Sequence, residues 1–443
     1  MASSLKSASS KARTFTHEGA PTVKVGAKEE LFRTISCCLL WENTFYEDGI
    51  AVADRIKSLV PAVKAEDVFD LAVYARTKLN LRHAPLMLAR ELARSEHSRP
   101  LLAALLPQIV LRADELAEFL AMYWSEGRCP IAHSVRRGLA KAFERFDEYA
   151  LAKYSRDKDV KLRDVLRLVH PVPADDSRSQ LYKKLKTDTL ETPYTWEVEL
   201  SKPGADKRQV WTDLINNKGL GAMAMLRNLR NMQEVKVADD LIRKGLTGMR
   251  TERVLPYRFI SAARFAPKFE AELEKAMFQS IDAKEKLPGT TVLLVDVSGS
   301  MSDPLSAKSD MQRLDAASGL AILLREVCET VTVYKFNNDA ELVPARRGFA
   351  LRDAIGRANG GTCLGKATQT VMARETPDRL IIITDEQSSD PVPSCSNGLK
   401  GYIVNVGSNK NGVGYRSGWV HVGGWSEAIV NYITQYESLI DAR

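Results

Sequence analysis

Cysteine and histidine are scarce in this 443-residue sequence, with six of each. The cysteines form no Cys-x-x-Cys pair and gather with no histidines, so the sequence supports neither a zinc site nor a framework of disulfides. They are Cys37, Cys38, Cys129, Cys328, Cys363 and Cys395. Because reduced thiols are typical of cytoplasmic proteins, we expect a cytoplasmic location.

Long hydrophobic runs are also missing. No segment approaches the ~18 to 20 apolar residues that a helix needs to cross a bilayer, so we expect no membrane partner. The nucleotide-binding pattern Gly-x-x-x-x-Gly-Lys-Ser/Thr is absent too. Residues 1–26 contain Lys6, Lys11 and Arg13 with no acidic residue before Glu18. We expect a disordered basic tail there, although a transit peptide has the same composition.

The positive charge of the chain, +7 in all, is confined to its first two thirds. Residues 289–443 hold 15 Lys and Arg against 17 Asp and Glu, whereas residues 1–288 hold 48 against 39. Such an asymmetry favours a polyanionic partner for the N-terminal region, with nucleic acid first and an acidic membrane surface second.

Polar side chains follow a short aliphatic run near residue 291. Thr291 to Val295 is typical of a buried strand, and Asp296, Ser298 and Ser300 come directly after it at alternate positions. In extended backbone, residues two apart project to the same side, so these oxygens can meet at one point. One carboxylate with hydroxyls suits Mg²⁺. A polar turn that caps the next helix is the simpler alternative.

Two later segments favour the metal site over the turn. Asn359-Gly360-Gly361-Thr362 is a loop that offers a hydroxyl, and a second strand-like run from Arg379 ends at Asp385. In a parallel sheet, loops at the carboxyl ends of strands gather at one edge. The sequence therefore predicts a five-oxygen site for a divalent metal ion, for which we expect Mg²⁺, formed by Asp296, Ser298, Ser300, Thr362 and Asp385.

Helical periodicity fills residues 27–286, whereas strands and helices alternate in residues 287–443. Helices of ten to fifteen residues with short turns predict stacked pairs of the HEAT type, which can curve or close into a ring. Residues 174–209 are expected to be loop and short helix. The later alternation predicts an α/β doubly wound, Rossmann-like domain.

Together these motifs resemble the Ro 60 kDa autoantigen family, in which a TROVE module precedes a von Willebrand factor A domain. The five oxygen ligands match the metal-ion-dependent adhesion site of A domains. The TROVE resemblance is carried by five strings: Leu86 to Leu92, Gly127-Arg128 before the helix from Val135, Lys161 to Pro171, Ala224 to Leu229, and Leu255-Pro256-Tyr257-Arg258. Together the resemblances span the chain from about Ala27 onward. The members of the family that the chain resembles are the bacterial Ro orthologs.

The resemblance implies a monomeric ring of helices that binds Y RNA-like noncoding RNA on a basic outer face. It also implies that single-stranded ends of misfolded RNA enter a central hole, and that an exoribonuclease is tethered through the RNA, in RNA quality control. Two groups of basic residues are the predicted contacts, although solvated helix faces would look the same. The residues are Arg136, Arg137, Lys141, Lys158, Lys161 and Arg163 in one group, and Arg227, Arg230 and Arg258 in the other.

We expect no enzyme. Catalytic magnesium sites usually gather several carboxylates around two ions and supply a general base, whereas this motif offers two carboxylates and three hydroxyls. Two alternatives remain. One is a protein-binding module whose metal ion captures an acidic side chain of a partner, and the other is a metal-dependent ribonuclease.

Overall fold

The computed structural model describes residues 26–36, 49–155, 158–217, 219–252, 254–282, 286–305, 310–395, 398–407, 418–423, 429–430, 433–434 and 437. Apart from Gly26, the predicted tail 1–26 lies outside them. The chain divides into a helical unit within Ala27–Glu42, Asp48–Glu285 and Ser426–Arg443, and an α/β unit that includes Lys286–Trp425. The predicted domain ranges stay a prediction. No helix among the described residues has the length and apolar content to span a bilayer.

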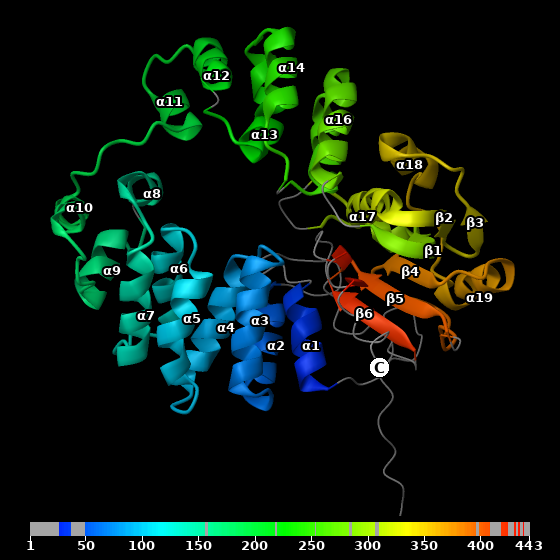
Figure 1. Cartoon of the computed structure of the whole chain (residues 1–443), viewed down its shortest axis with the longest axis horizontal. Coiled ribbons are helices and arrows are strands. Elements are labelled where there is room, and N and C mark those ends of the chain that lie inside the picture. Colours follow the sequence, from blue (N-terminus) through cyan, green and yellow to red (C-terminus); the bar gives the residue numbers. More distant parts are fainter. Residues whose placement is uncertain are drawn as a thin grey trace, which may run out of the picture. The chain divides into compact units, whose positions relative to one another are not determined.

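The first part of the helical unit is a stack with one continuous hydrophobic core, which extends from Leu31 to Leu185. Its helices are α1 (Ala27–Ser36), α2 (Gly49–Leu59), α3 (Ala65–Thr77), α4 (His83–Arg94), α5 (Leu102–Ile109), α6 (Asp114–Tyr123), α7 (His133–Phe143), α8 (Glu148–Tyr154), α9 (Leu162–Val169) and α10 (Asp176–Thr187). Single 3₁₀ turns precede α3 and α5, at Val60–Ala62 and Arg99–Leu101. Helices α1, α3 and α4 each touch both the next helix and the one after it, as α3 touches α4 and α5 (Figure 1). This is the stacking of helix pairs that the periodicity predicted.

The second part of the helical unit repeats the arrangement. Its helices are α11 (Trp196–Ser201), α12 (Lys207–Asn216), α13 (Ala222–Glu234), α14 (Asp239–Gly248), α15 (Pro256–Phe265) and α16 (Glu270–Ile281), with a 3₁₀ turn at Pro267–Phe269. Again α13 touches α14 and α15, and α14 touches α16.

The expectation of loop and short helix for residues 174–209 was wrong for α10, which has twelve residues. The carboxylate of Asp175 accepts a hydrogen bond from the backbone N–H of Arg178 and caps the helix. Only Tyr182 and Leu185 are buried along α10, so its apolar periodicity is too weak to recognise in the sequence.

The α/β unit contains a six-stranded sheet in the order β3-β2-β1-β4-β5-β6. The strands are β1 (Leu287–Asp296), β2 (Cys328–Phe336), β3 (Ala340–Leu342), β4 (Arg379–Thr384), β5 (Lys400–Asn405) and β6 (Trp419–Gly423). All neighbours are parallel except β3, a short antiparallel strand beside β2. The predicted α/β class is confirmed, and the antiparallel edge was not foreseen.

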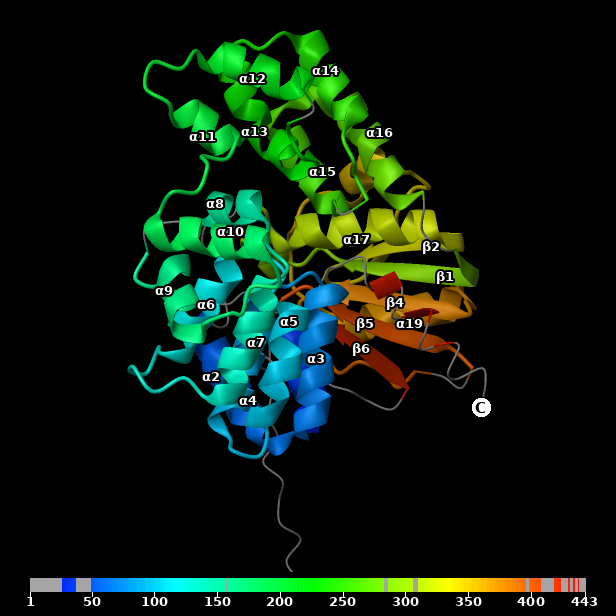
Figure 2. The same ribbon diagram turned by 60° about the vertical axis from the view of Figure 1, so that its left-hand side comes forward.

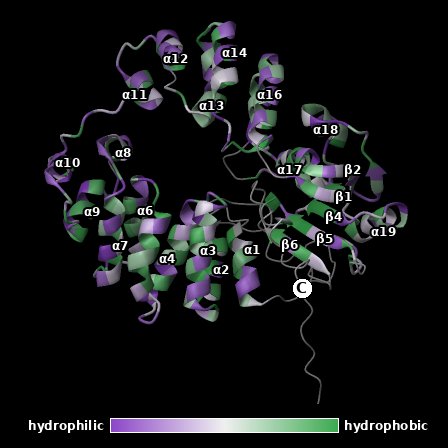
Figure 3. Ribbon diagram, in the orientation of Figure 1, coloured by the Kyte–Doolittle hydropathy of each residue, from purple (hydrophilic) through white to green (hydrophobic). Residues whose placement is uncertain are grey.

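Helices cover both faces of this sheet. Helix α17 (Arg313–Val327) contacts β1, β2 and β4 and lies along one face in Figure 2. Helix α19 (Leu364–Arg374) packs its apolar side against Val292 and Leu294, which project from the other face. The small helix α18 (Gly348–Ile355) packs on α17, and Gly299–Ser302 forms one 3₁₀ turn after β1. Figure 3 shows the consequence, since the central strands are largely hydrophobic whereas helices α3 and α4 mix both kinds of residue.

The strand order reverses direction at the centre of the sheet, between β1 and β4. From β1 it crosses to β2 on one side, and β4 lies against β1 on the other side. Ligands of such sheets bind beyond the carboxyl ends of the strands at this switch point. Asp296 ends β1 and Asp385 follows β4, so the predicted metal ligands stand at the switch point.

Candidate metal site and nucleic-acid interface

Asp296 is the buried centre of the predicted metal site, with none of its surface exposed. Its Oδ1 accepts a hydrogen bond of 2.8 Å from the backbone N–H of Ser298, and its Oδ2 accepts one of 2.6 Å from Oγ1 of Thr384. Ser298 and Ser300 bring their hydroxyl oxygens within 3.3 Å of each other. The alternate spacing in the sequence therefore does place these side chains together.

The loop that carries Thr362 is fixed against this turn by backbone hydrogen bonds. The N–H of Asn359 donates to the carbonyl of Val297 (2.7 Å), and the N–H of Gly299 donates to the carbonyl of Gly360 (3.0 Å). A Cβ atom on Gly299 would come within 3.3 Å of that carbonyl, so the close approach suits glycine. Thr362 is buried, and its carbonyl accepts from the N–H of Ser389 after β4.

Asp385 completes the set, and it already has a cationic partner. Its Oδ2 accepts a hydrogen bond of 2.8 Å from Nη1 of Arg313, and both residues are buried. The hydroxyl of Ser300 is hydrogen-bonded to Asp385 as well. The structure therefore gathers the three predicted segments, and it adds Arg313 and Thr384, which the sequence analysis missed. Thr384 could have been noticed beside Asp385, whereas nothing in the sequence marks Arg313.

The electrostatics of the site fit a cation. Burial raises the pKa of Asp296 to about 7, with a further rise from the charge of Asp385 and an opposing effect of the hydrogen bonds from Ser298 and Thr384. Burial also raises the pKa of Asp385, although Arg313 works against it. Two carboxylates without solvent disfavour each other's ionised form, and a divalent ion would offset that cost. Among the described residues no three of His, Cys, Asp and Glu form a metal-binding group, so a metal here would depend on the hydroxyls.

The predicted RNA contacts on α7 form one exposed, positively charged face. Val135, Leu139 and Phe143 turn inward and are fully buried. The opposite face exposes Arg136, Arg137 and Lys141. Within the described part of the chain none of these three cations has an ion-pair partner, so no described residue neutralises the charge of this face, which we call the α7 basic face.

The other predicted RNA contacts of the first group already interact with other residues of the protein. Lys158 lies 3.5 Å from Glu118, and Arg163 lies 3.1 Å from Asp188. Lys161 is half-buried at the start of α9, where its backbone N–H donates to Asp164. These positions therefore offer less free charge than the α7 basic face does.

The second predicted group lies on the neighbouring helices α13 and α15. Arg227 is exposed and has no ion pair among the described residues, whereas Arg230 pairs with Glu234 at 3.0 Å. The guanidinium of Arg258 is exposed and stands 4.7 Å from the centroid of the Tyr257 ring.

Aromatic rings alternate with cations on α8, a feature the sequence analysis did not identify. Nζ of Lys153 lies 5.7 Å from the ring of Tyr149 and 5.8 Å from that of Tyr154, and the guanidinium of Arg112 lies 4.5 Å from the latter ring. Tyr149 is 49% exposed. We call the cluster of Tyr149, Lys153, Tyr154 and Arg112 the α8 ladder. The spacing of Tyr149 and Lys153, four residues apart on a helix, is the sequence signal that could have identified it.

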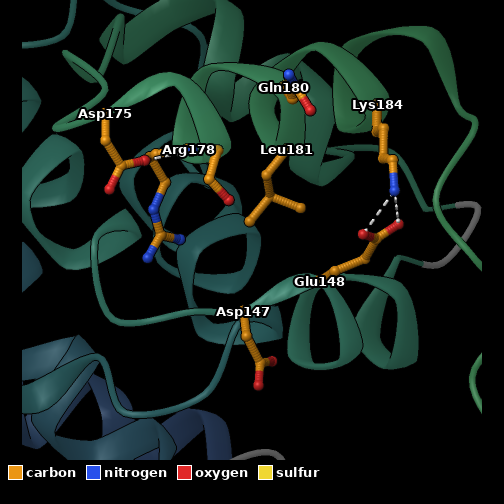
Figure 4. Close-up of a pocket in the computed structure, with 8 residues that line it drawn as sticks. Asp147, Glu148, Asp175, Arg178, Gln180, Leu181 and Lys184 are labelled. Atoms are coloured by element: carbon orange, nitrogen blue, oxygen red, sulfur yellow. Dashed lines mark hydrogen bonds and ion pairs between the residues drawn. The ribbon is translucent and has the colours of Figure 1, made fainter.

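A polar cleft of about 300 Å³ lies between α8 and α10 in the same region (Figure 4). Lys184 is held by Glu148 at 2.8 Å, and Arg178 donates a hydrogen bond of 3.0 Å to the carbonyl of Glu144. Asp147 and Asp175 also line the cleft. Three acidic side chains against two cations that already have hydrogen-bond partners make it a poor site for phosphate.

Comparison with known proteins identifies the family. The model described as "TROVE domain" matches residues 33–192 and 176–316, well over half of the chain. The chain therefore belongs to the TROVE-domain family, a family of RNA-binding proteins, and the predicted Ro resemblance is confirmed.

Named relatives agree with this. The mouse and rat proteins named Telomerase protein component 1 are 37% and 36% identical over 109 residues, 23% of this chain. The match spans only 4% of either relative. The crystal structure of the RO (RSR) protein of Deinococcus radiodurans superposes with a TM-score of 0.64 and 16% identity, over 92% of this chain and 99% of that one. At this identity the likeness shows the fold.

Proposed function

We propose that this protein is a cytoplasmic RNA-binding scaffold that holds small structured noncoding RNA, similar to Y RNA, on exposed basic helix faces. The observation that carries the proposal is the α7 basic face, where three exposed cations have no ion-pair partner among the described residues of a TROVE protein. Phosphate contacts by such cations release counterions and supply most of the affinity for RNA.

Single-stranded RNA ends, such as those of misfolded or decaying RNA, are the second proposed ligand. The α8 ladder supports this part, because bases stack on exposed aromatic rings and cations next to the rings attract the backbone. A scaffold that holds structured and single-stranded RNA would present substrates to a separate exoribonuclease in RNA quality control. Closure of the helices into a monomeric ring belongs to the same proposal.

The metal site is proposed to bind a divalent ion, Mg²⁺ first, through Asp296, Ser298, Ser300, Thr362 and Asp385. A bound ion would supply an open position for a carboxylate, which makes capture of an acidic partner protein the second candidate function. Its support is the pair of fully buried carboxylates surrounded by hydroxyls. A catalytic role is less favoured, because two carboxylates and one arginine lack the several acids and the general base of metal nucleases.

Crosslinking tests the main proposal. The full-length protein is crosslinked by ultraviolet light in the cells that produce it, purified under denaturing conditions, and the attached RNA is sequenced. We expect enrichment of a few small structured RNAs, reduced when Arg136, Arg137 and Lys141 are replaced together by Ala. Recovery of only random RNA fragments, in equal amounts from the wild type and the triple variant, would contradict the proposal.

A further inference from the structure

Arg313 is a buried cation inside the candidate metal site. It is the first residue of α17 and is 2% exposed. Its backbone N–H donates to the carbonyl of Asp303 at 2.9 Å, and Nη1 lies 3.4 Å from Oδ2 of the same residue. The same Nη1 donates to Asp385 at 2.8 Å. Arg313 is therefore held at its backbone by Asp303 and at Nη1 by both Asp303 and Asp385, a predicted metal ligand.

Three acidic side chains and one arginine determine the charge of the candidate metal site. Asp296 and Asp385 are fully buried, and Asp303 is mostly buried. Arg313 brings a permanent positive charge, since a guanidinium keeps its proton in proteins. Two ionised carboxylates are costly to bury unless positive charge lies close to them, so Arg313 supplies part of the charge that a metal ion would otherwise bring.

We infer that Arg313 is a built-in counter-cation, a positioning residue that holds Asp385 in place without a metal ion and lowers the affinity of the site for one. This inference rests on the proposed metal site. The fold of the α/β unit then does not require the ion, and binding of the ion becomes a reversible addition to a formed site. A divalent ion must share the Asp385 carboxylate with the guanidinium and must bind against its charge.

A matched comparison is available in the same unit. Arg379 is also buried, at 1% exposure, but it lies at the amino end of β4, where it donates to Oγ1 of Thr291 at 2.9 Å and to the carbonyl of Pro288 at 3.2 Å. Replacing either arginine by Met removes a buried charge of the same kind. Only Arg313→Met removes a cation that contacts a carboxylate of the candidate metal site.

The experiment measures thermal unfolding and Mn²⁺ binding by calorimetry for the full-length protein, Arg313→Met and Arg379→Met. Both variants are expected to melt below the wild type in EDTA. Mn²⁺ should restore most of the loss in Arg313→Met and none in Arg379→Met, and Arg313→Met should bind Mn²⁺ about tenfold or more tightly than the wild type. If Arg313→Met is unfolded in EDTA, its refolding on addition of Mn²⁺ is the same readout.

The measurements separate a wrong role for Arg313 from a wrong metal site. If the wild type binds Mn²⁺ but Arg313→Met is neither rescued nor tighter, Arg313 is a structural ion-pair partner only and the inference is overturned. If none of the three proteins binds Mn²⁺ or Mg²⁺, the metal-site proposal itself is wrong. Arg313→Lys keeps the charge, so an affinity near that of the wild type supports the electrostatic cause.

Discussion

At the scale of single residues, Gly138 sets the distance between two helices of the stack. A Cβ atom at this position would lie 2.4 Å from the carbonyl oxygen of Leu102 and 3.0 Å from the Cβ of Leu106. Both belong to α5, so α7 can approach α5 this closely only with a hydrogen at residue 138. The clash involves backbone, which a rotamer change cannot relieve.

Gly138→Ala is therefore expected to destabilise the protein by about 1 to 3 kcal/mol, the usual cost of overpacking. Gly248→Ala is the control, because no atom lies within 4 Å of a Cβ there and the position ends α14. It should be neutral or stabilising by up to about 1 kcal/mol. Urea unfolding followed by circular dichroism measures both, and equal midpoints would contradict the packing argument.

The sequence was enough to predict most of the residues of the candidate metal site, but not the residues that surround them. Alternate spacing after a strand placed Asp296, Ser298 and Ser300, since strand geometry is local. Arg313 could not be predicted, because its approach to Asp385 is a tertiary contact between residues 72 positions apart in the sequence. The same holds for Gly138, whose role depends on a helix some thirty residues earlier in the sequence.

At the scale of elements, α4 and α6 are joined by a network of charges around Glu118. Burial alone would raise the pKa of Glu118, but His83, with Nε2 3.6 Å from Oε2, and the charges of Arg82 and Lys158 lower it to about 2. Since the carboxylate is more acidic in the folded than in the unfolded chain, its contribution to stability is present above about pH 4.5. It is lost as the pH falls toward about 2.

Glu118→Gln tests this network. The variant should be less stable than the wild type at pH 7, and its stability should fall less between about pH 4.5 and 2, because a neutral side chain does not titrate. Melting temperatures measured across that range give the comparison. Glu234→Gln, which removes an exposed ion pair with Arg230, should leave the pH dependence unchanged. Identical acid sensitivity of the wild type and Glu118→Gln would disprove the assignment.

The α8 ladder gives a second prediction at this scale. Tyr149→Ala should weaken binding of a short single-stranded RNA by about 1 to 3 kcal/mol, the usual worth of one base stacked on an aromatic ring. Tyr194→Ala is the matched control, since Tyr194 is 51% exposed but has no cation over its ring among the described residues. Fluorescence anisotropy with labelled oligonucleotides measures both. Equal losses in the two variants would remove α8 from the RNA path.

Elements were predicted well where their apolar pattern was strong. The buried strands β1 and β4 are continuous apolar runs, and α7 alternates buried and exposed faces at helical spacing. Helix α10 escaped prediction because few of its residues are buried, and the three-residue β3 is too short to carry a pattern. The ladder on α8 depends partly on Arg112, which precedes α6, so its sequence signal was incomplete.

In the whole molecule, the two units have different proposed roles. The helical unit provides the exposed basic faces, whereas the α/β unit holds the buried oxygen site. Asp296→Ala should therefore abolish Mn²⁺ binding while the dissociation constant for a small structured RNA stays within about twofold of the wild type. Calorimetry and a filter-binding assay test the two halves. A collapse of RNA affinity in a folded Asp296→Ala protein would contradict this division.

The salt dependence of RNA binding shows whether the α7 basic face binds RNA phosphates. The dissociation constant of a small structured RNA is measured over a range of salt concentrations for the wild type and for the triple variant R136A/R137A/K141A. The control K184A/K202A/K268A removes equal charge from lysines already paired with Glu148, Glu199 and Asp239.

We predict weaker binding by the α7 variant, with a slope of log affinity against log salt that is shallower by about 2 to 3, near 0.9 for each lost phosphate contact. The control variant should keep a slope close to that of the wild type. Unchanged affinity and slope in R136A/R137A/K141A would show that the α7 basic face does not bind RNA.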